Sequence, residues 1–179
     1  MNFIPTPFEG LIILEPKIFR DDRGYFFESF NTEDFKKHNI AFDFVQDNQS
    51  LSNKGVLRGL HFQKPPFEQG KLIRVVKGSV WDIAVDIRKT SSTFGKYFAL
   101  ELNDRNNQML WIPPGFAHGF LTLEDNTIFL YKCTNFYNKT AESGIRYDDP
   151  DLNIQWSQKN TILSEKDLQL QSWKEFIAG

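Results

Sequence analysis

Short runs of alternating apolar and polar residues recur along the chain, and they predict a protein built mainly from β-strands. About ten runs, separated by turn signals, have this character: residues 11–16, 25–30, 43–50, 56–63, 71–76, 79–87, 96–102, 108–113, 117–123 and 127–134. That number of short strands is typical of a β-sandwich or a barrel.

Residues 79–87 give the clearest alternation. Because successive side chains of a strand point to opposite faces, this run separates into two sets. One set is Trp81, Ile83, Val85 and Ile87, and the other is Val80, Asp82, Ala84 and Asp86. The first face is expected to pack against a core, and the second to meet a mixed environment.

Helical signals are few. Residues 31–39 predict a helix capped by Asn31 or Thr32. Residues 164–176 predict another, in which Ser164 and Asp167 have the spacing of an N-cap and its acidic first turn. No repeat, low-complexity tract or flexible linker divides the sequence. We expect one domain over residues 1–179, mostly β, with a few short peripheral helices.

Composition and charge narrow the classes of partner. The 179 residues carry a formal net charge of -2, and 15% of them are aromatic, which is too many for a disordered chain. No run of Lys or Arg is long enough to follow a phosphate backbone, so nucleic acid is not an expected partner. The N-terminus lacks the features of a signal peptide, and no segment approaches the ~18 apolar residues of a membrane span. We expect a cytoplasmic protein without membrane attachment, whose only cysteine, Cys133, forms no internal disulfide.

The stretch VLRGLHFQ, residues 56–63, carries the first candidate chemistry. Histidine readily accepts a proton near neutral pH, so His61 is a candidate base. Arg58 offers a planar charged fork for phosphate or carboxylate, and Lys71 offers a compact positive charge on the next strand. The alternative is that these residues only line a polar barrel or an exposed strand face. Strict alternation puts Arg58 and His61 on opposite faces, so a shared site requires a bulge or a twist near Gly59.

Two further segments hold candidates. Tyr131, in the run 127–134, is a possible proton donor on the side opposite a histidine base, and the alternative is a half-buried tyrosine whose hydroxyl is already satisfied. Arg20, Arg23 and Glu28 surround a predicted turn at Gly24. For them the alternative is a charged loop tip followed by an alternating strand.

The segment IPPGFAHGF carries Pro113, Gly115 and His118 in the order P-x-G-x-x-H, between two predicted strands. This order resembles the second motif of the cupin family. The resemblance implies a cupin-type double-stranded β-helix, which is also called a jelly roll.

The histidines that a cupin metal site requires are incomplete. The first cupin motif supplies H-x-H, whereas the matching residues here are His61, Phe62 and Gln63. The third histidine of the chain besides His61 and His118 is His38, which lies on a predicted helix. Because the usual three-histidine site cannot be assembled, we expect no metal and no cofactor, and acid–base chemistry by side chains instead.

Uncommon strings follow one another through nearly the whole chain: LEPKIFRDDRGYFFESFN, FVQDNQSLS, VLRGLHFQ, QGKLIRVVKGSVWDIAVDIRKTSSTFG, LWIPPGFAHGF, FLYKCTNFY, ESGIRYDDPDLNIQW and LSEKD. In order and spacing they resemble the dTDP-4-dehydrorhamnose 3,5-epimerase family. The resemblance implies a cofactor-independent epimerase that inverts carbons 3 and 5 of dTDP-4-dehydro-6-deoxy-D-glucose, through an enolate, to give dTDP-4-dehydro-L-rhamnose.

The same resemblance implies the roles of individual residues. His61 is the base, Asp167 orients it, and Tyr131 returns the proton across the sugar ring, while Lys71 is expected to stabilise the enolate. The positions that match the nucleotide-sugar site are Arg23, Glu28, Gln46, Asp47, Asn48, Arg58, Lys71, His118, Glu142 and Lys166. Arg58 and Arg23 are expected to hold the diphosphate.

The resemblance further implies a homodimer in which the N-terminal strand region reaches into the partner, so that Arg23 and Glu28 act in the neighbouring subunit's site. Three alternatives stay open. The chain could epimerise one carbon, or move the ketone, on the same nucleotide sugar. It could be a metal-dependent cupin, or a jelly roll that binds a nucleotide sugar without turnover.

Overall fold

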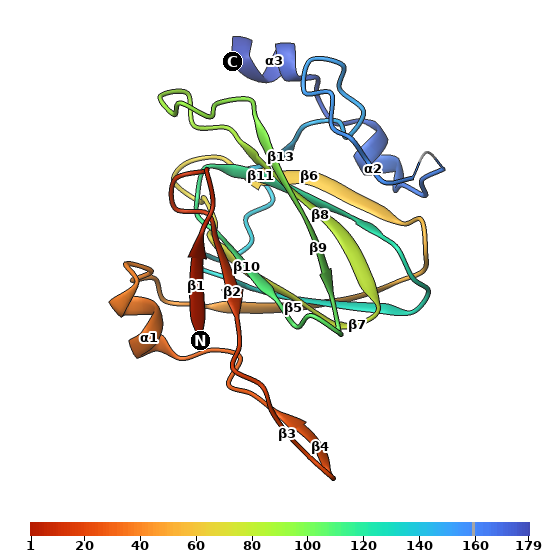
Figure 1. The fold of residues 1–179 in the computed structure, drawn as a ribbon. Helices are drawn as coiled ribbons and strands as arrows, with labels where there is room; N and C mark the ends of the chain where they lie inside the picture. The colour runs from red at the N-terminus through yellow and green to blue at the C-terminus, as the bar shows by residue number, and fades with distance from the viewer. Residues whose placement is uncertain (159) are drawn as a thin grey trace.

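The computed structural model describes residues 1–158 and 160–179, and two antiparallel β-sheets packed face to face form its body (Figure 1). The six-stranded sheet has the order β1 (Asn2–Pro5), β2 (Ile12–Glu15), β10 (Met109–Ile112), β7 (Lys71–Lys77), β12 (Thr127–Cys133) and β5 (Gln46–Ser52). The five-stranded sheet has the order β13 (Glu142–Gly144), β6 (Leu57–Gln63), β11 (Phe116–Thr122), β8 (Ser79–Asp86) and β9 (Tyr97–Asn103). The expectation of a mostly-β jelly roll is confirmed.

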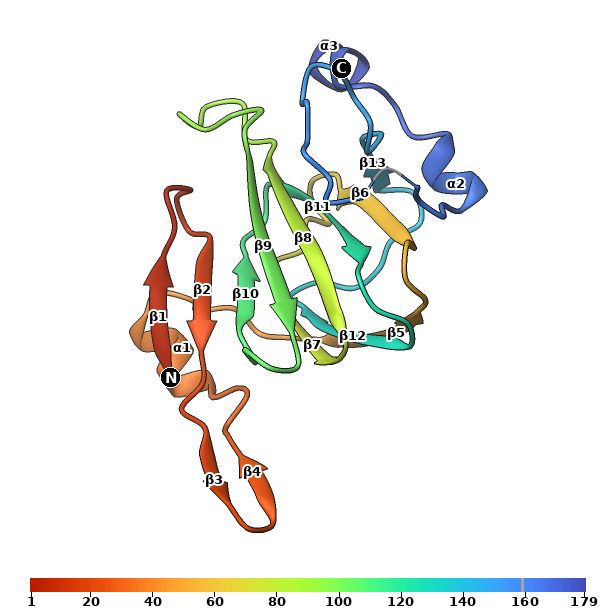
Figure 2. The ribbon, with the colours of Figure 1, turned by 45° about the vertical axis from the view of Figure 1, so that its right-hand side comes forward.

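A two-stranded hairpin stands apart from this body. It consists of β3 (Phe19–Asp21) and β4 (Gly24–Phe26), and it projects away from both large sheets in two views (Figures 1 and 2). The predicted strand over residues 25–30 was wrong beyond Phe26. Phe30 instead packs edge-on against Phe35 of a helix, with ring centroids 4.9 Å apart. The alternating pattern there reflects aromatic contacts of a loop with a helix.

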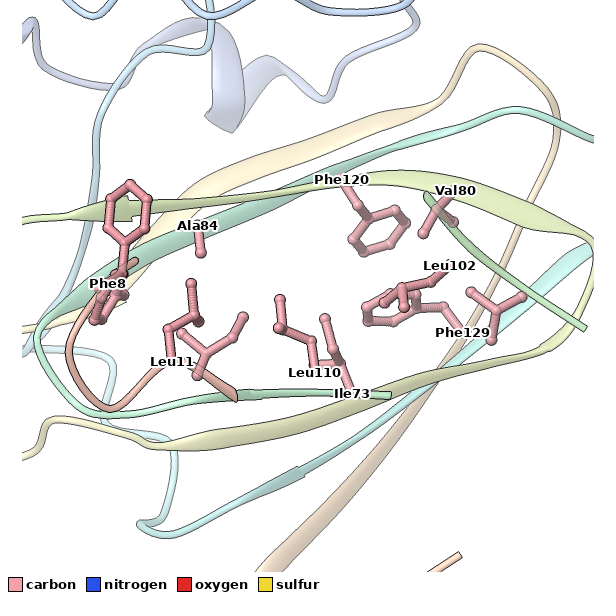
Figure 3. Packing of buried hydrophobic residues seen from close by; sticks show 12 residues of the cluster. Phe8, Leu11, Ile73, Val80, Ala84, Leu102, Leu110, Phe120 and Phe129 are labelled. Carbon is pink, nitrogen blue, oxygen red and sulfur yellow. The ribbon is translucent and has the colours of Figure 1, made fainter. Parts of the chain in front are cut away.

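The space between the two large sheets is filled by apolar side chains from both of them. Figure 3 shows Ile73 and Leu110 from one sheet facing Val80 and Phe120 from the other. The rings of Phe120 and Phe129 stack across this space with centroids 4.1 Å apart. This inner cluster holds the two sheets together, because packing them face to face removes both apolar surfaces from water.

Both large sheets are also covered on their outer faces. Beneath the C-terminal segment, Ile83 and Val85 pack in a second buried cluster that includes Trp173. As a result, both faces of the predicted strand 79–87 are buried, and the face expected to be mixed lies inside the barrel. Its two carboxylates, on Asp82 and Asp86, are at most 1% exposed.

Within residues 1–158 and 160–179, three short helices lie at the periphery. The predicted helix after residue 31 is confirmed as α1 (Thr32–Lys37), and its N-cap is Asn31, whose side chain accepts from the Glu33 backbone. The predicted helix over residues 164–176 is two helices, α2 (Glu165–Leu168) and α3 (Trp173–Ala178). Ser172 starts α3 anew with a capping box, and a bridge from Gln171 to Ile145 interrupts the helical run. Among the described residues, no helix is both long and apolar enough to cross a membrane.

A β-bulge in β6 sets the direction of its polar side chains. His61 pairs with His118 of β11, and Arg58 pairs with Phe120, so that Gly119 alone opposes the two residues between Arg58 and His61. The extra residue reverses the alternation, and Arg58 and His61 therefore project from the same face, into the barrel. The bulge that a shared site requires near Gly59 is present.

Glycine is the residue that fits this bulge. Gly59 has φ +124°, and a Cβ atom added there would lie 2.5 Å from the Cα of Gly119. A side chain at this position would suffer both backbone strain and a collision with the facing strand.

Asp86 ends β8 and anchors the turn that follows. Its carboxylate accepts hydrogen bonds from the Arg88 side chain at 2.7 Å, from Ser91 at 2.7 Å and from Thr93 at 2.6 Å. Burial alone would raise the pKa of this carboxyl, but the hydrogen bonds outweigh burial and lower the pKa to about 2. The guanidinium of Arg88 also lies 4.6 Å from the ring centre of Phe116, which ties this turn to β11.

Asp86→Asn is expected to reduce the free energy of unfolding at pH 7 by about 2 kcal/mol, because the carboxyl has a pKa lower in the folded than in the unfolded state. The contribution is present above the unfolded pKa and is lost as the pH falls from about 4 to about 2. Urea denaturation at a series of pH values tests this. If the difference in unfolding free energy between variant and wild type is the same at pH 7 and at pH 2.5, the prediction is wrong.

Gly59→Ala is expected to lower the free energy of unfolding by more than about 2 kcal/mol, because strain and a backbone collision add together. Gly24→Ala is the matched control: Gly24 has φ +126°, but a Cβ there meets nothing within 4 Å. Thermal and urea denaturation of both variants isolates the collision. Equal destabilisation by the two substitutions would show that the approach of the two strands does not matter.

Candidate active site

Polar side chains gather at one edge of the barrel, where the edge strands β5 and β13 of the two sheets face each other. They line a small cavity between the sheets. The lining residues are Gln46, His61, Phe62, Gln63, Gln69, Lys71, Tyr131, Cys133, Tyr137 and Glu142. Five of the residues predicted for the site are thereby brought together: His61, Lys71, Tyr131, Gln46 and Glu142.

The predicted partnership of His61 with Asp167 is present in the geometry. His61 Nε2 lies 2.5 Å from Asp167 Oδ1, and Ser164 donates to the other oxygen at 2.8 Å. Burial opposes ionisation of Asp167, but the hydrogen bonds from His61 and Ser164 outweigh it and lower the pKa of this carboxyl, with a further contribution from the Gly59 backbone. An ionised Asp167 favours the tautomer with the proton on Nε2, so Nδ1 of His61 carries the lone pair.

Tyr131 projects from β12 into the same cavity. Burial raises the pKa of its hydroxyl, Cys133 adds to this, and the positive charge of Arg58 opposes it. Tyr131 is therefore a neutral hydroxyl at physiological pH, and it can donate a proton. Arg58 projects from the same face of β6 as His61, which lines this cavity. Arg58 Nε donates to Ser52 at 3.2 Å.

Lys71 begins β7 and shares its inner face with Ile73 and Val75, which belong to the barrel core. Burial lowers the pKa of its ammonium group, while Cys133, Asp82 and Glu142 oppose this. A partly desolvated cation at this position can interact strongly with negative charge that develops inside the cavity.

His118 is buried beside the cavity and makes one strong contact. Its Nε2 lies 2.9 Å from Asp82 Oδ2, and Asp82 belongs to the inner face of β8. Burial lowers the pKa of His118 more than Asp82 raises it, so the ring is neutral. His118 is therefore a polar wall of the site and carries no charge of its own.

The rim of the cavity is held by hydrogen bonds between predicted and unpredicted residues. Glu142 accepts from the Tyr137 hydroxyl at 2.7 Å and pairs with Lys166. Gln46 donates to Asn48 at 2.9 Å and accepts from the backbone of Tyr137. These contacts make one connected rim of Lys166, Glu142, Tyr137, Gln46 and Asn48.

Of the predicted residues that do not line this cavity, three are turned away from it or lie on or just after the β3–β4 hairpin. Asp47 falls between Gln46 and Asn48 on β5, so it points to the outer face, where it pairs with Lys132 at 2.9 Å. Arg23 is 90% exposed on the β3–β4 hairpin, where it binds Asp21. Glu28 follows the same hairpin and contacts Asn31. The hairpin lies far from β6 and β13 (Figures 1 and 2).

Several side chains of the site were given no role from the sequence, among them Asp82, Tyr137 and Gln63. The alternation of residues 79–87 already put Asp82 on the face that was expected to meet a mixed environment. The structure shows that this face lies inside the barrel. Gln63, which replaces the second cupin histidine, donates to the backbone oxygens of Phe67 and Phe136 and accepts from the Asn138 backbone. It holds two loops together.

Among the described residues, no group of three or more His, Cys, Asp or Glu is arranged to hold a metal ion.

A larger cavity of about 510 Å³ lies beside this one, against α3, and shares Gln63, Gln69 and Lys71 with it. Neither His61 nor Tyr131 reaches it, and its Arg88 is already bound to Asp86. We therefore place the chemistry in the smaller cavity.

Comparison with known proteins gives the family of the chain. A curated relative, the dTDP-4-dehydrorhamnose 3,5-epimerase of Shigella flexneri, is 52% identical over 169 residues, which are 94% of this chain and 93% of the relative. Among solved structures, the dTDP-6-deoxy-D-glucose-3,5-epimerase of Legionella pneumophila, in complex with dTDP-4-keto-L-rhamnose, is 46% identical with a TM-score of 0.92, and covers 96% of this chain and 92% of its own. A 3'-monoepimerase from Streptomyces bikiniensis, in complex with dTDP-quinovose, is 31% identical with a TM-score of 0.89, over 94% and 86% of the two chains. Residues 5–175 match the family described as dTDP-4-dehydrorhamnose 3,5-epimerase, and the chain belongs to that family.

Proposed function

We propose that the chain inverts carbons 3 and 5 of dTDP-4-dehydro-6-deoxy-D-glucose to give dTDP-4-dehydro-L-rhamnose, without a cofactor. The observation that carries this proposal is that His61, bound to Asp167, lines one cavity together with the protonated hydroxyl of Tyr131. The proposal is supported by the activity named for the family and by the sugar nucleotide bound to the Legionella relative.

The chemistry follows from the position of the ketone. Carbons 3 and 5 both flank the carbonyl at carbon 4, so removal of either proton gives an enolate whose charge is delocalised to the ketone oxygen. His61 takes the proton on Nδ1, and Asp167 stabilises the imidazolium that forms. Because inversion requires the proton to return on the opposite face, Tyr131 donates it there. A positioned acid or base contributes a rate factor of about 10²–10⁴.

Cationic side chains interact with the two negative groups of the reaction, the enolate oxygen and the diphosphate. Lys71, on the inner face of β7, stabilises the enolate oxygen, and one such donor typically contributes a factor of about 10²–10³. Arg58 binds the diphosphate with its planar fork. Gln46, Asn48, His118, Glu142 and Lys166 position the nucleotide sugar.

A second candidate function is epimerisation at one carbon. The 3'-monoepimerase from Streptomyces bikiniensis has nearly the same backbone, with a TM-score of 0.89. The fold and a base–acid pair are therefore compatible with either outcome, and the number of inverted carbons is decided by how the sugar ring is held.

We further propose that the working enzyme is a homodimer in which the β3–β4 hairpin enters the partner's site. The hairpin exposes Phe19, Tyr25 and Phe26 by 54%, 52% and 69%, and such exposed aromatics mark protein contacts. It also carries Arg23, whose charge has no use in its own chain beyond the contact with Asp21. In this arrangement Arg23 and Glu28 complete the neighbouring site.

In deuterated water, incubation with the 4-keto sugar nucleotide is expected to place deuterium at carbons 3 and 5, because the returning proton comes from groups that exchange with solvent. Nuclear magnetic resonance of the sugar measures this. Deuterium at one carbon would establish a mono-epimerase, and none at either carbon would contradict the proposal.

Single substitutions assign the roles. His61→Asn should reduce exchange at both carbons by about 10²–10⁴, whereas Tyr131→Phe should reduce net inversion more than the initial proton removal. The matched controls are His38→Asn and Tyr147→Phe, which change residues outside the cavity. If His61→Asn exchanges at the wild-type rate, another residue is the base.

The exchange of the hairpin is tested with mixed dimers of Arg23→Ala and His61→Ala subunits, purified by two different tags. Each homodimer should be nearly inactive. The mixed dimer should regain about half of the wild-type activity, because one of its two sites receives Arg23 from one chain and His61 from the other. A mixed dimer no more active than the homodimers would place Arg23 in its own chain's site.

A further inference from the structure

One carboxylate in the barrel interior has no place in the proposed reaction. Asp82 lies on the inner face of β8, between Val80 and Ala84, and is 1% exposed. Its Oδ2 accepts from His118 at 2.9 Å, whereas its Oδ1 is buried without a hydrogen-bond partner in the described part of the chain. A buried carboxylate oxygen in this situation is costly unless a cation lies near it.

Lys71 is a cationic side chain on the inner face of the opposite sheet, and it lines the cavity together with His61, the neighbour of the His118–Asp82 pair. Lys71 shares the inner face of β7 with Ile73, and Asp82 acts on its ammonium group across the interior. Burial lowers the pKa of Lys71, and hence the fraction that is charged. The enolate-stabilising role proposed above requires a charged ammonium group, so some negative group must offset burial.

Three groups oppose the effect of burial on Lys71: Cys133, Asp82 and Glu142. Cys133 supplies no charge at neutral pH, because burial raises the pKa of its thiol. The charge of Glu142 is already neutralised by Lys166, and its other oxygen accepts from Tyr137. Asp82 is the remaining member of the three, and in the described part of the chain no lysine or arginine pairs with its carboxylate, which contacts His118.

The other titratable groups around Lys71 leave this assignment unchanged. From β11, His118 contacts Asp82 as a neutral ring, because burial lowers its pKa. From β6, His61 is bound to Asp167. From β12, Tyr131 is a neutral hydroxyl whose pKa is raised by burial. None of them is an anion that could replace Asp82.

We propose that Asp82 is a positioning residue: its carboxylate keeps Lys71 protonated inside the barrel and holds His118 with the proton on Nε2. Lys71 and Asp82 then form the charge pair of the barrel interior, and the ammonium group stays ready for the enolate oxygen. The consequence for catalysis rests on the function proposed above, whereas the charge state of Lys71 in the free protein does not.

The titration of Lys71 in the protein without substrate tests the charge pair directly. With ¹³C-labelled lysine, the Cε resonance of Lys71, assigned with Lys71→Arg, reports its midpoint. Asp82→Asn keeps the size of the side chain and removes its charge, and the midpoint should fall by at least about one pH unit, a tenfold change in the protonated fraction. An unchanged midpoint would overturn the proposal.

Asp86→Asn is the matched control, because Asp86 is equally buried on the same face of the same strand but is bound to Arg88. Its substitution should leave the Lys71 midpoint within about 0.3 pH units. An equal shift in both variants would mean that any loss of charge or stability in β8 has this effect, and it would also overturn the proposal.

A measurement on the wild type covers the case in which Asp82→Asn does not fold. With ¹³Cγ-labelled aspartate, assigned through backbone correlations, the Asp82 resonance should show a step at the midpoint of Lys71. If the Asp82 resonance shows no such step, the proposed charge pair of Lys71 and Asp82 is wrong. In turnover assays of Asp82→Asn, the pH at which kcat falls on the alkaline side should shift with the Lys71 midpoint, while KM changes little. If the midpoint shifts but the chain does not epimerise, the proposed function fails and the charge pair stands.

Discussion

The close approach of Gly59 to Gly119, across β6 and β11, is the contact on which the site depends. Two residues of β6 are accommodated opposite one residue of β11, and this reverses the alternation between Arg58 and His61. The same backbone also turns towards Asp167, since Gly59 contributes to the low pKa of that carboxyl. The proposed base, the carboxylate that orients it and the proposed anion-binding arginine therefore depend on a single irregularity that glycine accommodates.

The barrel can hold a polar site because most of its stabilisation comes from elsewhere. The inner cluster fills one part of the interior, and two further clusters cover the outer faces of the sheets. The polar groups of the site lie at the edge between β5 and β13, where hydrogen bonds join Gln46 to Asn48 and Tyr137 to Glu142. The proposed pairing of Lys71 with Asp82 gives the buried Asp82 carboxylate a cationic partner as well. It would explain why an aspartate occurs on a strand face whose other side chains are mostly apolar.

Local pattern was enough to predict most strands, α1 with its Asn31 cap, and the need for an irregularity at Gly59. It failed where a longer-range contact decides the outcome. The bridge between Gln171 and Ile145 divides a sequence that reads as one helix, and Phe30 leaves its expected strand to pack on Phe35. Asp47 pairs with Lys132 on the outer face of β5 in this chain, and its place in the nucleotide-sugar site stays a prediction. Asp82 escaped notice because the sequence does not reveal that both faces of its strand are buried.

The central claim is that His61 and Tyr131 act from opposite sides of the sugar ring. A crystal structure of the chain with a dTDP-sugar analogue that cannot form an enolate tests this most directly. The account predicts His61 Nδ1 on one face of carbons 3 and 5, the Tyr131 hydroxyl on the other, and the Lys71 ammonium group beside the oxygen on carbon 4. A bound sugar with both His61 and Tyr131 on the same face would contradict it.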